Sequence, residues 1–159
     1  MINKRTSSDM FSKSERSRIM RAVKSTKTKP EELFAAAIEP LDLEFTRNPV
    51  EIPGKPDFYF ASIGVAVFIH GCFWHGHDKC RRGIVRPKAN AEFWNAKIEK
   101  NKRRDRRVVR LLRKRGIAVY TVWECRFRGK TPPKRVINRL LNRSGRSSCE
   151  ADPDRGDSS

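Results

Sequence analysis

The chain has 159 residues, a length that suits one domain around a single core. Its 36 lysines and arginines against 18 acids give a net charge of +18, which indicates a nucleic-acid partner in preference to a basic charge for solubility or for anionic lipid. The longest apolar run, residues 65–69, is too short to cross a bilayer, and the N-terminus lacks the apolar core of a signal peptide. We therefore expect a cytoplasmic protein without membrane contact, whose four cysteines are metal ligands or inert thiols because disulfides are rare there.

The first quarter of the chain predicts a basic arm and one well-marked helix. Residues 1–17 have little apolar content and are expected to be flexible, and residues 17–25 have the pattern of a short helix. Residues 28–40 predict a longer helix, because Thr28 and Glu31 match a capping box and prolines stand in its first turn and at its end.

The middle of the chain predicts a small sheet and a long helix. Two apolar runs, residues 56–60 and 65–69, predict strands, and the second is expected at the centre of the sheet with both faces buried. A helix over residues 90–116, ended by Gly116, leads to another buried strand at residues 117–123.

The C-terminal part predicts one more helix and a tail. The helix covers residues 133–143, and the Ser- and Asp-rich residues 144–159 are expected to be disordered. Helices mixed with buried strands predict an α/β domain over residues 18–143, with a small central mixed sheet flanked by helices.

The loop "HGCFWHGHDKC", residues 70–80, concentrates metal ligands. The spacing of Cys72, His77 and Cys80 suits three ligands around one ion, and Cys125, just past a strand end, is the natural fourth. A structural zinc needs four soft ligands and no open position, so we expect zinc here. The alternative is that Cys72 and Cys125 are ordinary buried thiols. Cys149 lies in the tail and is not part of the predicted site.

Four polar residues are candidates for chemistry. His70 and His75 remain once the predicted zinc has its ligands, although either could be a surface histidine. Asp57 precedes a strand, and a carboxylate at a strand end is a good ligand for Mg²⁺. Glu31 could face the same site, but the capping box explains it without a further role.

Asp105 stands on the apolar stripe of the long helix, within about 60° of Trp94, Ile98, Val109 and Leu112 by the 3.6-residue period. A carboxylate on that stripe needs a partner, because an unpaired buried charge is costly. An arginine such as Arg103 or Arg106, or a histidine held in one tautomer for base catalysis, would each serve, and periodicity does not decide between them.

Three aromatic residues, Phe73, Trp74 and Trp94, are either core or surface wedges. Residues 97–115 carry eleven lysines and arginines against two acids, and rings beside such a charge field can unstack bases while arginines hold phosphates.

Four segments together resemble a known family. "PGKPDFYF", "FIHGCFWHGHDKC", "EFWNAKIEKNKRRDRR" and "VWECRFRG" are similar, in order and spacing, to the very short patch repair (Vsr) DNA mismatch endonucleases. The resemblance covers about residues 20–128. It implies a variant of the restriction-endonuclease-like fold, the PD-(D/E)xK class, and a Mg²⁺-dependent nick on the 5′ side of the thymine in a T:G mismatch left by deamination of 5-methylcytosine.

The resemblance also implies roles, residue by residue. Asp57 would bind Mg²⁺, His75 would be the general base and Asp105 would orient it, while His70 and Glu31 would support the reacting water. The zinc ligands would be Cys72, His77, Cys80 and Cys125, and the rings that wedge into the duplex would be Phe73, Trp74 and Trp94.

One departure concerns the second strand, which ends in Phe68, Ile69 and His70 and so lacks the D/E-x-K pattern of the wider fold class. Some relatives have threonine in place of Ile69. In this chain we expect Ile69 to bind Mg²⁺ through its backbone carbonyl.

The resemblance further implies a bacterial, nucleoid-associated monomer. Its candidate partners are double-stranded DNA with a T:G mismatch, a cytosine-5 methyltransferase system and mismatch-repair proteins.

Two other functions are alternatives on the residues alone. A zinc-stabilised DNA-binding module without catalysis leaves Asp57 and Asp105 unexplained, and an HNH-type nuclease requires a second histidine at a spacing that the chain lacks.

Overall fold

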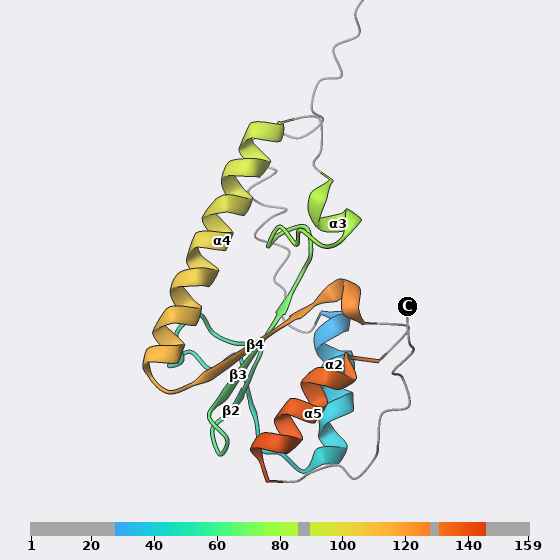
Figure 1. Cartoon of the computed structure of the whole chain (residues 1–159), viewed down its shortest axis with the longest axis vertical. Coiled ribbons are helices and arrows are strands. Elements are labelled where there is room, and N and C mark those ends of the chain that lie inside the picture. Colours follow the sequence, from blue (N-terminus) through green and yellow to red (C-terminus); the bar gives the residue numbers. More distant parts are fainter. Residues whose placement is uncertain (1–27, 86–89, 128–130, 146–159) are drawn as a thin grey trace, which may run out of the picture.

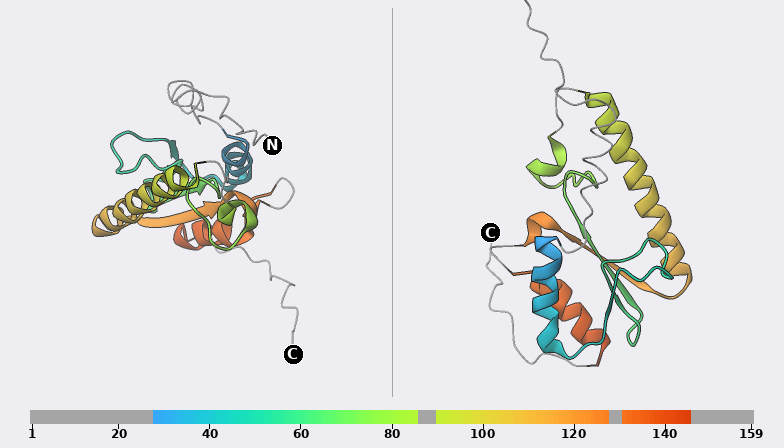
Figure 2. Two further views of the ribbon diagram at one scale, coloured as in Figure 1. Left: turned by 90° about the horizontal axis from the view of Figure 1, so that it is seen from above. Right: turned by 180° about the vertical axis from the view of Figure 1, so that it is seen from behind.

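The computed structural model describes residues 28–85, 90–127 and 131–145, which form three layers (Figure 1). A four-stranded sheet carries α4 (Ala91–Lys114) on one face and α2 (Lys29–Ile38) with α5 (Lys134–Arg143) on the other. Figure 2 shows α2 and α5 together on the side of the sheet away from α4. The prediction of an α/β domain is confirmed. The predicted basic arm, the helix at residues 17–25 and nearly all of the predicted tail lie outside the described residues.

The sheet is mixed, as predicted. Its order is β1 (Thr46–Arg47), β2 (Phe58–Phe60), β3 (Val65–His70) and β4 (Ala118–Trp123). The β1–β2 and β2–β3 pairs are antiparallel, and β3 and β4 are parallel from the Val65–Ala118 pair to the His70–Trp123 pair. Three strand termini therefore meet at one end of the sheet: the carboxyl ends of β3 and β4 and the start of β2.

Two apolar clusters hold the layers together. The larger joins α2 and α5 to the sheet and contains Phe34, Ile38, Val136 and Leu140 from the helices and Phe58, Phe60, Val65, Val67 and Val122 from the strands. The smaller joins α4 to the opposite face through Leu112, Ala66 and Ile117. The predicted inward stripe of α4 is also found, since Ile98 and Leu112 are buried and Trp94, Asp105 and Val109 are half-buried.

The long helix ends as its sequence predicts. Gly116 has φ of 74°, its N–H donates to Arg113 O at 3.0 Å, and the N–H of Ile117 donates to Leu112 O at 3.0 Å. This pattern is a Schellman motif, which turns the chain directly into β4.

Several details differ from the predictions. The strand at β4 is not buried throughout: it is an edge strand of the described sheet, and only Val122 is fully buried, with Thr121 exposed. The strand β1 and the short helices α3 (Arg81–Ile84), η1 (Glu39–Leu41) and η2 (Glu124–Arg126) were missed, because two to four residues carry too little periodicity to be recognised. Within the described ranges, no helix has the length and apolar content needed to span a bilayer.

The capping box is wrong in its contacts. Thr28 is the N-cap of α2, but its side chain makes no capping bond to the backbone. Its hydroxyl instead donates to Glu31 Oε1 at 2.6 Å. Glu31 is only 6% exposed, so its carboxylate is buried while it accepts this bond from the N-cap residue.

Candidate active site and metal cluster

The four predicted zinc ligands come together at the carboxyl edge of the sheet. The ligand atoms of Cys72, His77, Cys80 and Cys125 all lie within 4.8 Å of one another, and Cys125 Sγ is 3.3 Å from His77 Nδ1. Cys72 is fully buried, His77 is 4% exposed, and the three cysteines are free thiols. A tetrahedral ion with Zn–S bonds of about 2.3 Å needs ligand separations of this order, so the group could hold a metal ion.

Local packing builds this cluster. The N–H of His77 donates to Cys72 O at 2.9 Å, which closes the loop on itself. A Cβ atom at Gly83 would lie 2.0 Å from His77 O, so only glycine lets α3 pack against the loop. Burial raises the pKa of the Cys72 thiol to about 12, so a bound cation is needed to hold that sulfur as the thiolate at neutral pH.

His75 and Asp105 form a close pair. Asp105 Oδ2 lies 2.5 Å from His75 Nδ1, and the side chains are 20% and 17% exposed. Burial alone would raise the pKa of Asp105, but the hydrogen bond and charge of His75 outweigh it and lower that pKa. Of the two partners that the sequence left open, the structure provides the histidine and also an arginine. That arginine is Arg104, at 3.2 Å from Asp105 Oδ1.

The two arginines that the sequence suggested, Arg103 and Arg106, pair with Glu99 instead. Arg104 was missed because it precedes Asp105 directly, and adjacent helical residues do not face each other unless a long side chain folds back.

A chain of rings links the pair to the metal cluster. The rings of His75 and His70 stack with their centroids 3.7 Å apart and an interplanar angle of 13°. The ring of Trp123 meets His70 edge-on at a centroid distance of 5.4 Å, and it also stacks on the ring of His77 at 4.2 Å. Burial, followed by the charge of His75, lowers the pKa of His70 to about 3, so that ring is neutral at physiological pH. His70, His75 and Asp105 also have ligand atoms within 4.8 Å of one another, so this group too could hold a metal ion.

Asp57 lies across β3 from this pair. Its Oδ2 accepts the N–H of Ile69 at 2.6 Å. Burial raises the pKa of Asp57 to about 6; the hydrogen bond from Ile69 opposes that rise, and the charge of Glu31 adds to it. Glu31 therefore lies close enough to act on Asp57. Its role in the chemistry remains a prediction. The position of Ile69 beside Asp57 is now clear, while the role of its carbonyl remains a prediction.

The three predicted wedge residues form an aromatic cluster outside both core clusters. Phe73 lies 5.2 Å from Trp74 and 5.3 Å from Trp94, and the two tryptophans are 5.8 Å apart. Trp74 is 38% exposed, so the core explanation fails for this ring. Phe93, 51% exposed and 5.3 Å from Trp94, extends the cluster and was missed. Its place beside Trp94 in the first turn of a basic helix is the signal that could have identified it.

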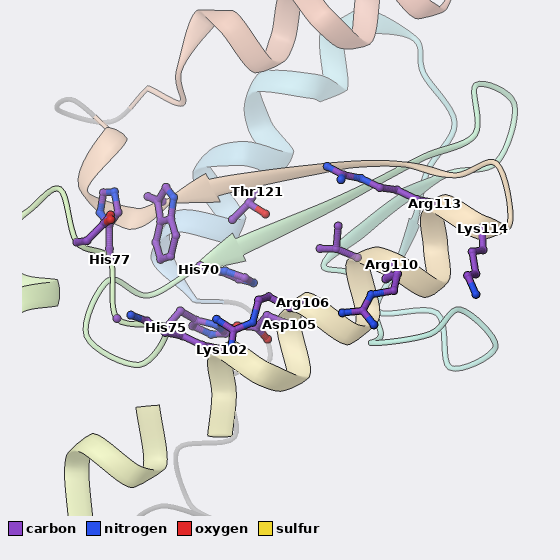
Figure 3. A pocket seen from close by; sticks show the side chains of 14 residues that line it. His70, His75, His77, Lys102, Asp105, Arg106, Arg110, Arg113, Lys114 and Thr121 are labelled. Carbon is purple, nitrogen blue, oxygen red and sulfur yellow. The ribbon is translucent and has the colours of Figure 1, made fainter. Parts of the chain in front are cut away.

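An open cleft of about 880 Å³ adjoins the His75–Asp105 pair, between α4 and β4 (Figure 3). His70, His75 and Asp105 are among its lining residues, and basic side chains of α4 line one wall. Asp57, Glu31 and the aromatic cluster are not among its lining residues, so the cleft is a separate surface that shares the histidines with the candidate active site.

These features define an α/β protein with a cluster of cysteines and a histidine that could hold a metal ion, a half-buried carboxylate, and a histidine–aspartate pair beside a strongly basic helix. The profile of the DNA mismatch endonuclease Vsr family matches residues 8–82. DNA mismatch endonuclease Vsr of Escherichia coli K12 is 39% identical over 122 residues, which is 77% of each chain. Type II nicking enzyme V.NmeAIP of Neisseria meningitidis Z2491 is 39% identical over 133 residues, 84% of this chain and 94% of that one.

A further relative, type II nicking enzyme V.NmeDIP of Neisseria meningitidis serogroup C, is 44% identical over 116 residues, 72% of this chain and 77% of its own. The chain belongs to the DNA mismatch endonuclease Vsr family. The resemblance read from the sequence is confirmed.

Proposed function

We propose that the protein is a DNA mismatch endonuclease that nicks one strand on the 5′ side of the thymine in T:G mismatches left by deamination of 5-methylcytosine, and so begins very short patch repair. The observation that carries this beyond family membership is the 2.5 Å His75–Asp105 pair together with the half-buried Asp57, whose pKa the charge of His75 influences. A DNA-binding module without catalysis would leave both features without a role. The restriction-endonuclease-like topology, action as a monomer and links to a methyltransferase system or repair proteins remain predictions.

The side chains divide the work of phosphodiester hydrolysis. Asp57 is the candidate ligand for Mg²⁺, which would neutralise the phosphate and the leaving 3′ oxygen. His75 takes a proton from the attacking water through its free ring nitrogen, because Asp105 holds the other nitrogen. Neutral His70 keeps the ring of His75 in place by stacking, and Glu31 orients water near Asp57. The products are a 5′-phosphate and a 3′-hydroxyl.

One assay tests this function. Purified protein and Mg²⁺ are incubated with a duplex that contains a single T:G pair, with the matched C:G duplex alongside. We expect one nick 5′ of the thymine in the first duplex alone. Binding to both duplexes without a nick in either would support the non-catalytic alternative.

We also propose that the Cys72, His77, Cys80 and Cys125 cluster holds one structural zinc. Three sulfurs and one nitrogen match the soft donor set that zinc takes in closed sites, and the cluster ties the loop after β3 to the end of β4. Zinc would therefore fix the loop that carries His75.

Removing one zinc ligand should unfold that loop and most of the domain. Zinc sites contribute about 10–16 kcal/mol in small zinc-finger peptides, which is comparable to the whole stability of an ordinary domain. We expect one zinc per chain by metal analysis, and a large drop in melting temperature for Cys72→Ala and Cys125→Ala. Cys149→Ser, which lies outside the described residues, is the matched cysteine control and should change neither quantity. Normal folding of the wild type in chelator would contradict the proposal.

Loss of a ring from the aromatic cluster should reduce discrimination between T:G and C:G duplexes more than it reduces folding stability. We propose that Phe73, Trp74 and Trp94 insert beside the mismatch, where the weakly paired step opens at lower cost. Trp74→Ala should then lower the T:G to C:G affinity ratio by the equivalent of about 1–3 kcal/mol, the usual value of one stacked base. Its melting temperature should change little, because the ring is 38% exposed.

The core residue Phe34 provides the contrast for this measurement. Phe34→Ala should cost about 3–5 kcal/mol of folding stability and leave the affinity ratio unchanged, since the ring is fully buried. If Trp74→Ala instead behaves like Phe34→Ala, the aromatic cluster is packing and not a wedge.

A further inference from the structure

The cleft between α4 and β4 has a cationic wall that the proposed chemistry does not use. Two acidic residues line the cleft, Asp78 and Asp105, and Asp105 is already bound to His75. The basic side chains along the wall are all from α4: Lys102, Arg106, Arg110, Arg113 and Lys114.

Much of this positive charge is uncompensated. Arg106 pairs with Glu99 at 3.0 Å. Within the part of the chain that the structure describes, no carboxylate forms an ion pair with Arg110, Arg113 or Lys114. A concave surface lined by one sign of charge concentrates ions of the opposite sign.

The spacing of the cations suits a polymer of regularly placed anions. Lys102, Arg106, Arg110 and Arg113 recur at steps of three or four residues, so they lie in one row on the helix. From Lys102 to Lys114 the helix rises about 18 Å. A row of this length can contact several successive phosphates of one DNA backbone.

The size and position of the cleft favour one strand over two. A cleft of about 880 Å³ is within the size range of pockets that hold a small ligand, so it suits a few nucleotides of one strand better than a duplex. Val109 and Trp123 add apolar surface for sugars or bases. His70, His75 and Asp105 line the cleft near the loop after β3, and Arg113 and Lys114 line it near the end of α4 (Figure 3). A strand held along α4 would therefore lead away from the candidate reacting centre.

We propose that this cleft binds the backbone of a single DNA strand that leaves the His75–Asp105 pair along α4. The inference rests on the proposed nuclease function, and it adds a second nucleic-acid contact that is distinct from Asp57 and from the aromatic cluster. A strand freed at one end by the nick would be its natural occupant.

Salt dependence of binding provides the test. The cleft variant combines Arg110→Gln, Arg113→Gln and Lys114→Gln, since glutamine removes charge but retains helix propensity. Binding of a labelled oligothymidylate is measured at several salt concentrations. Loss of three phosphate contacts should reduce the slope of log K against log salt by about 2, at about 0.7 per contact for single strands.

A matched control removes the same charge from other positions on α4 and its C-cap. Lys100, Arg107 and Arg115 are exposed and do not line the cleft, and their triple glutamine variant should keep the wild-type slope. Zinc content and melting temperature confirm that both variants are folded. If the triple cleft variant does not fold, Arg113→Gln alone should reduce the slope by about 0.7.

Three outcomes would overturn the proposal. The cleft variant could keep the wild-type slope, or both variants could lose slope equally, which would indicate net charge and not a site. A labelled polyglutamate of equal charge could also bind the wild type more tightly than the oligonucleotide and lose binding in the cleft variant, which would indicate an acidic peptide partner. Nicking of the T:G duplex by the wild type is scored separately, so failure of the cleft and failure of the nuclease function are distinguishable.

Discussion

Asp57→Asn should lower the single-turnover nicking rate on a T:G duplex by at least about a thousandfold. A metal ion at the reacting phosphate supplies several kcal/mol of charge stabilisation, and each ~1.4 kcal/mol is a factor of ten in rate. DNA affinity should stay within about threefold of the wild type, because it comes largely from lysine and arginine contacts to phosphates. The two measurements are a quench-flow nicking assay and a binding titration without Mg²⁺.

Asparagine is chosen so that the fold survives. Its amide oxygen can still accept the N–H of Ile69, which donates to Asp57 at 2.6 Å.

Burial raises the pKa of Asp57 from 3.8 to about 6, so the folded state binds this proton more tightly than the unfolded state. The stability that this carboxyl contributes is therefore fully present below pH 3.8 and is lost as the pH rises through about 6. Near neutral pH the variant should be at least as stable as the wild type. Nicking that persists in Asp57→Asn at saturating Mg²⁺ would exclude this residue as the essential ligand.

The second large effect concerns the His75–Asp105 pair. His75→Ala and Asp105→Asn should each reduce the nicking rate by about 10²–10⁴, the usual contribution of a positioned base. The double variant should be no slower than His75→Ala alone, because groups that act as one unit lose their joint contribution when either is removed. Single-turnover rates of the four proteins give this cycle directly.

Arg104 provides the control for this cycle. Its guanidinium touches Asp105 Oδ1 at 3.2 Å, but its side chain is 61% exposed. An exposed ion pair contributes about 0–1 kcal/mol, so Arg104→Gln should cost less than about tenfold in rate. If the double variant loses as much nicking rate as the losses of His75→Ala and Asp105→Asn combined, Asp105 does not act through the histidine.

The chain order of motifs was sufficient for the α/β class and for grouping the candidate site residues. Apolar runs at residues 65–69 and 117–123 located β3 and β4, and the 3.6-residue period placed Asp105 on the inward face of α4. Ligand spacing grouped Cys72, His77 and Cys80, because residues a few positions apart in a short loop cannot separate far. These are local properties, which a sequence carries without reference to the rest of the molecule.

The contacts between distant segments were decided only by the tertiary structure. Helix periodicity predicted that the partner of Asp105 is either an arginine or a histidine. In the structure the loop after β3 approaches α4 and brings His75 to Asp105. The side chain of Arg104 also reaches Asp105, from the same helix. The N-terminal turn of α2 predicted Glu31 as a cap, and the fold also brings its buried carboxylate close enough to Asp57 to raise the pKa of that residue. The cleft along α4 exists because β4 is an edge strand with the helix standing beside it. The physical reason is the same in each case: the sequence by itself determines local conformation and composition, whereas the partner of a buried charge depends on which remote group the folded chain brings within hydrogen-bonding distance.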